Sequence, residues 1–158
     1  DIYEHKLKRI RDGAARLGLS NIRTELQDAS VCREEWKDSA DVVLCDVPCS
    51  GLGIIRKKPE IRFKNPDEIR TLPEIQARIL ANCAQYVKKG GTLVYSTCTI
   101  LQRENEDVVR AFLTENPEFE AVSWTHPVCG ERADGMVTLL PPVHNTDGFF
   151  IAKMHRKV

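Results

Sequence analysis

The chain has 158 residues, of which 42% are hydrophobic and 29% charged, as expected for one globular domain with a real core. Acidic and basic residues balance at 23 each, so the net charge does not indicate a nucleic-acid partner, and such a partner must be sought in local clusters. No apolar run approaches the roughly 18 residues of a membrane-spanning helix, and no signal peptide is visible. We therefore expect a cytoplasmic protein that does not associate with a membrane.

The six cysteines are spread along the chain, at positions 32, 45, 49, 83, 98 and 129. None of them forms a CxxC pair, several lie in apolar strand or helix patterns, and the four histidines are scattered. This distribution argues against a zinc site and favours reduced thiols over a disulfide framework. We expect no metal.

In the first third of the chain, apolar residues at helical spacing predict a helix over 4–17, with Gly18 at its C-terminal cap. Alternating residues predict a strand over 22–26 that ends near Asp28. The run 41–45 is apolar without alternation, which is typical of a strand buried on both faces of a parallel sheet.

A strong helix start follows at Asn65, with proline at the first helical position and glutamate three residues after the cap. Thr71 and Glu74 offer a second capping box around Pro73. This pattern predicts a short helix that breaks at the proline and restarts.

The remaining elements alternate between strand and helix. Lys88-Lys89-Gly90-Gly91 is expected to end the preceding helix, because cations and glycine favour a helix C-terminus. A strand over 91–96 and a helix over 104–115 follow, and Asn116-Pro117 stops that helix. Residues 136–140 and 148–154 read as an antiparallel strand pair. The whole predicts an α/β sheet with an antiparallel end.

Two cysteine motifs each follow a predicted strand: Asp46-Val47-Pro48-Cys49-Ser50-Gly51 and Ser96-Thr97-Cys98-Thr99. Residues just past the carboxyl ends of parallel strands line the ligand crevice of an α/β fold, so both thiols can face one substrate. A cysteine acts as a nucleophile in its thiolate form at a partly exposed site. Taken alone, Cys98 is better explained as a small buried core residue.

Together with their surroundings, these motifs resemble a known family. The segments 46–63 and 90–109, together with Gln76 and the C-terminal stretch 139–154, are similar to the RNA cytosine-C5 methyltransferases, and within them to the branch that modifies 16S ribosomal RNA. The resemblance covers essentially the whole chain. It implies a Rossmann-like, S-adenosylmethionine-dependent methyltransferase fold, here one partial catalytic domain over 1–158.

The resemblance also implies separate catalytic roles. Cys98 is the nucleophile that adds to C6 of cytosine, and Cys49 is linked to release of the product. Asp46 holds the cytosine edge at N3 or N4 and stabilises the ring during attack. Cytosine-C5 methyltransferases of DNA attack with the cysteine that follows proline. The additional cysteine after threonine, Cys98, therefore indicates an RNA substrate rather than DNA.

Binding residues follow in the same way. The resemblance implies that Asp1 binds the ribose of S-adenosylmethionine, that Asp28 contacts its adenine, and that Asp46 also lies at the cofactor; for Asp28 the competing interpretation is a turn or cap residue. Ribosomal RNA is expected to contact a basic stretch beside Cys49, whose cations bind phosphate and whose aromatic ring stacks on a base. That stretch contains Arg56, Lys57, Lys58, Arg62, Phe63 and Lys64. Arg103 and Glu104 are interpreted as helix-start residues.

A glycine-rich cofactor loop does not occur in this sequence. We therefore expect a fold truncated at its N-terminus, with the first two strands missing, and a chain that alone neither binds the cofactor normally nor turns over. Two alternatives stay open: a non-catalytic RNA-binding domain of the same fold, and a thiol redox protein in which Cys49 and Cys98 pair.

Overall fold

The computed structural model describes residues 1–158, which form four α-helices, seven β-strands and four short 3-10 helices. In chain order the elements are α1 (Glu4–Arg16), η1 (Glu34–Trp36), β1 (Ala40–Asp46), η2 (Leu52–Ile54), η3 (Pro59–Phe63), α2 (Pro66–Ala84), β2 (Val87–Thr97), η4 (Gln102–Glu104), α3 (Glu106–Glu115), β3 (Phe119–Ala121), β4 (Trp124–His126), β5 (Gly130–Arg132), β6 (Met136–Leu139), α4 (Pro141–His144) and β7 (Phe149–Arg156).

The main sheet has five strands in the order β1-β2-β7-β3, and β6 also pairs with β7. The strands β1 and β2 run parallel, whereas β7 is antiparallel to β2, β3 and β6. Both β3 and β6 lie along the same edge of β7, because β3 pairs with its last residues and β6 with its first. A separate hairpin joins β4 to β5. The parallel β1–β2 pair and the antiparallel β6–β7 pair confirm the predicted α/β sheet with an antiparallel end.

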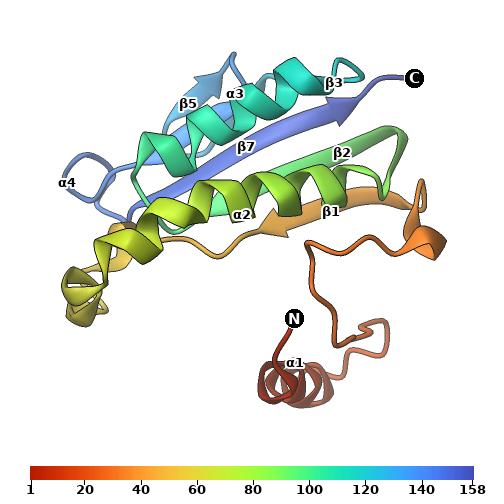
Figure 1. Ribbon diagram of the computed structural model, residues 1–158, viewed down its shortest axis with the longest axis horizontal. Coiled ribbons are helices and arrows are strands. Elements are labelled where there is room, and N and C mark those ends of the chain that lie inside the picture. Colours follow the sequence, from red (N-terminus) through yellow and green to blue (C-terminus); the bar gives the residue numbers. More distant parts are fainter.

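The core lies between the sheet and the helices α2 and α3, which cover one of its faces (Figure 1). Tyr95 and Leu93 of β2 and Phe150 of β7 are fully buried there, against Leu80 of α2 and Val109 of α3. Tyr95 and Phe150 meet edge to face, with ring centroids 6.1 Å apart. This single packed layer fixes the two strands from which the candidate site residues emerge.

The first 33 residues stand apart from this layer. Figure 1 shows α1 beyond the β1 edge of the sheet, away from α2 and α3. The helix ends where it was predicted, and Gly18 adopts the left-handed φ of +68° that terminates many helices. The predicted strand over 22–26 does not form, since no neighbouring strand is available to pair with it.

The strand β1 is the outer strand of the sheet, so the prediction that it is buried on both faces was wrong. Cys45 points into the core, but Val42 is 63% exposed and Leu44 67% exposed. An unbroken apolar run is typical of a strand covered on both faces. Here only α2 and α3 supply a cover, and they lie on one side.

Helix α2 also differs from its prediction. Its start is as expected, because the Asn65 side chain accepts a hydrogen bond from the Asp67 backbone at 3.0 Å. It then runs without a break through Pro73. The Thr71 hydroxyl donates to the Glu68 carbonyl at 3.0 Å instead of capping a second helix. The Lys-Lys-Gly-Gly sequence at 88–91 lies in β2 rather than at the end of α2, which already stops at Ala84.

A close contact between two glycines ties the turn after β1 to the start of β7. The Gly53 N–H donates to the Cys98 carbonyl at 3.0 Å, and the Gly53 carbonyl accepts from Gly148 N–H at 2.8 Å. A Cβ atom on Gly53 would lie 2.1 Å from the Gly148 carbonyl oxygen. Only glycine allows this approach, which fastens the Cys98 loop to two other segments.

We expect Gly53→Ala to lower the free energy of unfolding by about 1–3 kcal/mol, because backbone atoms have to move to admit the methyl group. Gly13→Ala is the matched control, since nothing lies within 4 Å of a Cβ atom there. Within helix α1 that substitution should stabilise the protein by up to about 1 kcal/mol. Urea denaturation of both variants measures the difference, and equal effects would contradict the contact.

Candidate active site

The two cysteine motifs lie at the same edge of the sheet because β1 and β2 are parallel and in register. Cys45 pairs with Tyr95 and Asp46 with Ser96, and the ladder continues through a hydrogen bond from Val47 N–H to the Ser96 carbonyl at 3.2 Å. The segments that follow β1 and β2 therefore leave the sheet at the same edge. The expectation that the two thiols face a common site is confirmed in its geometry.

The Sγ atoms of Cys49 and Cys98 are 3.2 Å apart, and both cysteines are free and half-buried. The hydrogen bond from Cys49, opposed by burial, lowers the pKa of Cys98 to about 7. The same contact, together with burial, raises the pKa of Cys49. The pair therefore favours a state in which Cys49 keeps its proton and donates it toward a Cys98 thiolate, the reactive form of a cysteine.

The Asp46 carboxylate is exposed at the end of β1 and accepts a hydrogen bond from the Ser96 hydroxyl at 3.0 Å. Its negative charge opposes ionisation of Cys98, whereas the positive charge of Lys64 favours it. The Asp46 carboxylate and the Cys98 thiol are thus close enough to influence one another electrostatically.

A cavity of about 340 Å³ opens directly over the thiols. Its walls come from the turn after β1, from η2 and η3, and from the loop after β2. The lining residues are Cys49, Gly51, Ile54, Lys58, Glu60, Ile61, Lys64 and Cys98. A volume of this order, with apolar and cationic walls, suits a small planar ring next to phosphate.

The predicted basic stretch divides into three parts. Arg56, Lys58 and Arg62 are exposed, and Phe63 is 84% exposed with the Arg62 guanidinium over its ring. Lys57 forms an ion pair with Asp147 in the loop before β7. Lys64 is exposed as well, but its ammonium group donates to the Ser50 carbonyl at 2.8 Å and the residue lines the cavity.

A buried polar network beneath the thiols contains two side chains whose positions the sequence does not reveal. Glu104 and Gln76 are both 0% exposed. The Glu104 Oε2 atom accepts from the Ser50 backbone N–H at 2.8 Å and from Gln76 Nε2 at 2.9 Å. We interpreted Glu104 as a helix-start residue, and it does end η4, just before α3. The only signal in the sequence was the unusual carboxylate within six residues of the second cysteine motif.

Of the three acidic residues expected at the cofactor, Asp1 and Asp28 lie on adjacent segments, and Asp46 lies at the end of β1. The Asp1 carbonyl accepts from Gln27 N–H at 3.1 Å, which places Asp1 beside Asp28. The Asp1 carboxylate accepts from Tyr3 N–H at 3.0 Å, and Asp1 lines a second cavity of about 510 Å³ together with Gln27, Trp36 and Tyr86. The Ser30 hydroxyl and N–H hold the pKa of Asp28 below its usual range.

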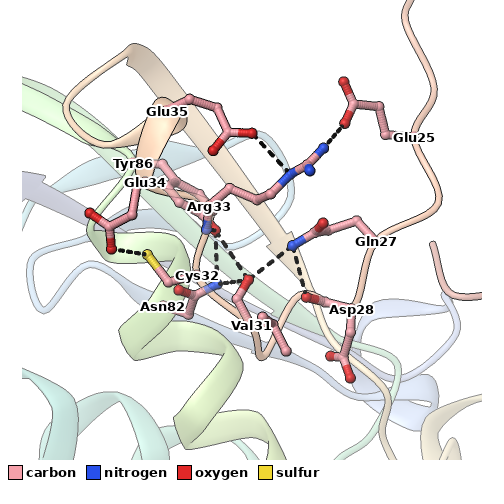
Figure 2. Close-up of polar contacts among 10 residues, drawn as sticks. All are labelled: Glu25, Gln27, Asp28, Val31, Cys32, Arg33, Glu34, Glu35, Asn82 and Tyr86. Atoms are coloured by element: carbon pink, nitrogen blue, oxygen red, sulfur yellow. Dashed lines mark hydrogen bonds and ion pairs between the residues drawn. The ribbon is translucent and has the colours of Figure 1, made fainter.

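Figure 2 shows how the loop carrying Asp28 is held in place. The Gln27 side-chain amide donates to the backbone carbonyls of Asp28 and Val31, and Asn82 of α2 donates to the Val31 carbonyl at 3.2 Å. The Asp28 carboxylate points away from this cluster (Figure 2). The Asp28 carboxylate accepts hydrogen bonds from the Ser30 N–H and hydroxyl, which makes Asp28 a turn residue, as the competing interpretation proposed. Asp28 is also exposed at the surface.

Neither a metal site nor a membrane-spanning element is visible in residues 1–158. No three histidine, cysteine or acidic side chains gather closely enough to hold an ion. None of the helices combines the length and the apolar character needed to cross a bilayer.

Known proteins resemble this chain along its whole length. A family model described as 16S rRNA methyltransferase RsmB/F matches residues 1–155. The probable ribosomal RNA small subunit methyltransferase B of Bacillus subtilis is 44% identical over 164 residues, which cover 99% of this chain and 37% of that protein. The chain therefore spans little more than a third of that relative.

Two crystal structures show the same architecture. The structure of PH0851 superimposes with a TM-score of 0.92 at 35% identity, covering 99% of this chain and 36% of that one. A methyltransferase homologue from Pyrococcus horikoshii gives a TM-score of 0.80 at 29% identity, with coverage of 99% and 52%. The mixed α/β fold thus matches methyltransferase structures, and the chain belongs to the RsmB/F family of 16S rRNA methyltransferases.

Proposed function

We propose that this chain carries the catalytic residues of an RNA cytosine-5 methyltransferase that acts on 16S ribosomal RNA. The observation that carries the proposal is the contact between Cys49 and Cys98, 3.2 Å apart at the floor of a cavity. Membership of the RsmB/F family supplies the substrate class and the cofactor, S-adenosylmethionine.

Cys98 is the nucleophile in this proposal. Cytosine C5 is a poor nucleophile, so the Cys98 thiolate first adds to C6, and the electrons of the C5–C6 double bond move to C5. S-adenosylmethionine, when bound, supplies the methyl group that C5 accepts. The lowered pKa of Cys98 makes the thiolate available near neutral pH.

In this proposal Asp46 assists the first step of the reaction and Cys49 assists the last. Asp46 lies at the carboxyl end of β1 and holds the cytosine edge at N3 or N4 while C6 is attacked. After methylation, a base accepts the C5 proton, the electrons of that C–H bond reform the C5–C6 double bond, and the Cys98–C6 bond breaks to return the Cys98 thiolate. Cys49 assists this release from its position beside the departing sulfur, since the two Sγ atoms lie 3.2 Å apart in the free site.

The residues present fit only part of the cofactor. Asp1 and Asp28 lie on adjacent segments and offer carboxylates for its ribose and adenine, with Asp46 between them and the substrate in this proposal. We propose that the glycine-rich loop and the first two strands belong to a preceding part of a longer protein. Two observations support this view: β1 pairs only with β2, so its other edge is unpaired, and the apolar side chains of Val42 and Leu44 on its uncovered face are exposed.

Ribosomal RNA binds across the mouth of the cavity in this proposal. The exposed cations Arg56, Lys58 and Arg62 meet its phosphates, and the exposed Phe63 ring stacks on a base. Lys64 belongs to the thiol site as well as to the RNA surface in this proposal, because it lines the cavity and donates to the Ser50 carbonyl.

The covalent step can be tested with RNA. We expect a full-length protein containing this chain to form a stable adduct with a 16S ribosomal RNA fragment that carries 5-azacytosine, because the ring nitrogen at position 5 holds no proton to lose. Denaturing gel electrophoresis detects the adduct. Cys98→Ala should abolish it, whereas Cys129→Ser, outside the site, should leave it intact.

Cys49→Ala should instead accumulate the adduct on unmodified RNA in the presence of S-adenosylmethionine, since release is slowed while attack continues. A wild-type protein that binds this RNA without any adduct would favour the alternative of a non-catalytic RNA-binding domain.

The reactivity of Cys98 should depend on pH with a midpoint near 7. Below that pH the thiol is protonated and unreactive, and above it the thiolate predominates. The rate of alkylation by iodoacetamide, followed for the peptide that contains Cys98 by mass spectrometry, should therefore rise with pH through about 7. A midpoint in the ordinary thiol range, about 8.5, would contradict the hydrogen bond from Cys49.

RNA binding should weaken when the exposed cations are removed. Replacing Arg56, Lys58 and Arg62 together by alanine removes up to three phosphate contacts. The slope of log affinity against log salt should then fall in magnitude by about 0.7 for each lost contact with single-stranded RNA. Filter binding at several salt concentrations measures it. Arg110→Ala, an exposed cation of α3, is the control and should leave the slope unchanged.

A further inference from the structure

The Glu104 carboxylate is fully buried beneath the two thiols, and the chemistry proposed above does not use it. Its Oε2 atom accepts two hydrogen bonds, from Ser50 N–H at 2.8 Å and from Gln76 Nε2 at 2.9 Å, while its Oε1 atom has no partner. Burying a carboxylate with one oxygen unpaired is costly. If this side chain only filled space in the core, an apolar residue of similar size would stabilise the protein more.

The contacts of Glu104 and of its partner Gln76 hold the backbone on both sides of Cys49. The residues on both sides of Cys49 are anchored, since Gln76 Nε2 also donates to the Pro48 carbonyl at 3.0 Å and Glu104 holds the Ser50 N–H. Cys49 thus lies between two backbone groups that the same pair of buried side chains fixes in place.

The same segment also holds the neighbours of Cys98. The Thr97 hydroxyl donates to the Asn105 side-chain oxygen at 2.6 Å, and the Asn105 amide donates to the Thr99 carbonyl at 3.2 Å. The hydroxyls of Ser50 and Thr99 lie 2.7 Å apart and link the two loops directly. The adjacent residues Glu104 and Asn105 therefore set the position of one thiol each.

We infer that Glu104 and Gln76 form a positioning pair that holds the Cys49 thiol in hydrogen-bonding contact with Cys98. The inference deepens the proposed function, on which its catalytic meaning rests. A contact between sulfur atoms weakens steeply with distance and misalignment, so a small shift of the turn at 48–50 is enough to remove the donated hydrogen bond.

The test measures the pH midpoint of Cys98 alkylation in folded variants, whose near-ultraviolet circular dichroism matches the wild type. Glu104→Ala leaves Ser50 N–H without its acceptor, so the midpoint should rise by about 1–2 pH units, toward the ordinary thiol range. Glu104→Gln keeps an acceptor oxygen and should stay within a few tenths of a unit of the wild type. Glu115→Ala and Glu115→Gln make the same changes at an exposed site of α3 and should have no effect.

A double-variant comparison separates positioning from general destabilisation. Cys49→Ala removes the donor itself and sets the largest expected shift. If Glu104 acts through Cys49, adding Glu104→Ala to Cys49→Ala should produce no further shift. An additional shift in that background would overturn the inference, as would an unchanged midpoint in folded Glu104→Ala or an equal shift in Glu104→Gln.

If Glu104→Ala does not fold, Gln76→Met decides the matter, because it removes the Pro48 contact while filling a similar volume. A raised midpoint supports the positioning pair, and an unchanged one overturns it. These alkylation measurements need neither RNA nor cofactor. Failure of the wild type to form an adduct with 5-azacytosine RNA would refute the proposed function alone, whereas unshifted midpoints would refute the positioning pair alone.

Discussion

The arrangement of the site depends on the parallel register of β1 and β2. Two parallel strands end at the same edge of a sheet, and the pairing of Asp46 with Ser96 lets both cysteine loops begin at the same level. A slip of one residue would turn the side chains of a strand to the opposite face. The burial of Cys45, Leu93 and Tyr95 under α2 and α3 opposes such a slip, so the packing of the core also sets the distance between the thiols.

Two thiols that share one hydrogen bond can have different roles although they are chemically identical. In such a pair the donor becomes harder to ionise and the acceptor easier. The contact raises the pKa of Cys49 and lowers that of Cys98, as expected where Cys49 keeps the proton. The surrounding charges oppose one another, since Asp46 disfavours the thiolate and Lys64 favours it. The hydrogen bond with Cys49 is the largest influence on the pKa of Cys98, so the position of Cys49 matters more to this thiol than the opposing charges around it.

Local patterns predicted well those features that local chemistry determines. The end of α1 at Gly18, the start of α2 at Asn65 and the terminal antiparallel strands follow from capping and alternation. The meeting of Cys49 and Cys98 followed from their places after two strands. The exposed face of β1 could not be predicted, because it depends on what covers the strand. The role of Glu104 was hidden for a related reason: a carboxylate at the start of a helix is already explained by the helix dipole, and only the packed structure shows that it is buried.

The two halves of the proposed chemistry have unequal structural support. The thiols lie just beyond the ends of β1 and β2, and buried side chains hold the backbone beside them at the Pro48 carbonyl, the Ser50 N–H and the Thr99 carbonyl. Asp1 and Asp28 lie on a segment that pairs with no strand and is held by side-chain contacts to α2, beyond an outer strand with exposed Val42 and Leu44. The contact between the two thiols therefore does not depend on the segment that carries Asp1 and Asp28. The reactivity of the thiols can therefore be measured separately from the proposed methyl transfer. That reactivity alone reports on the geometry of the site.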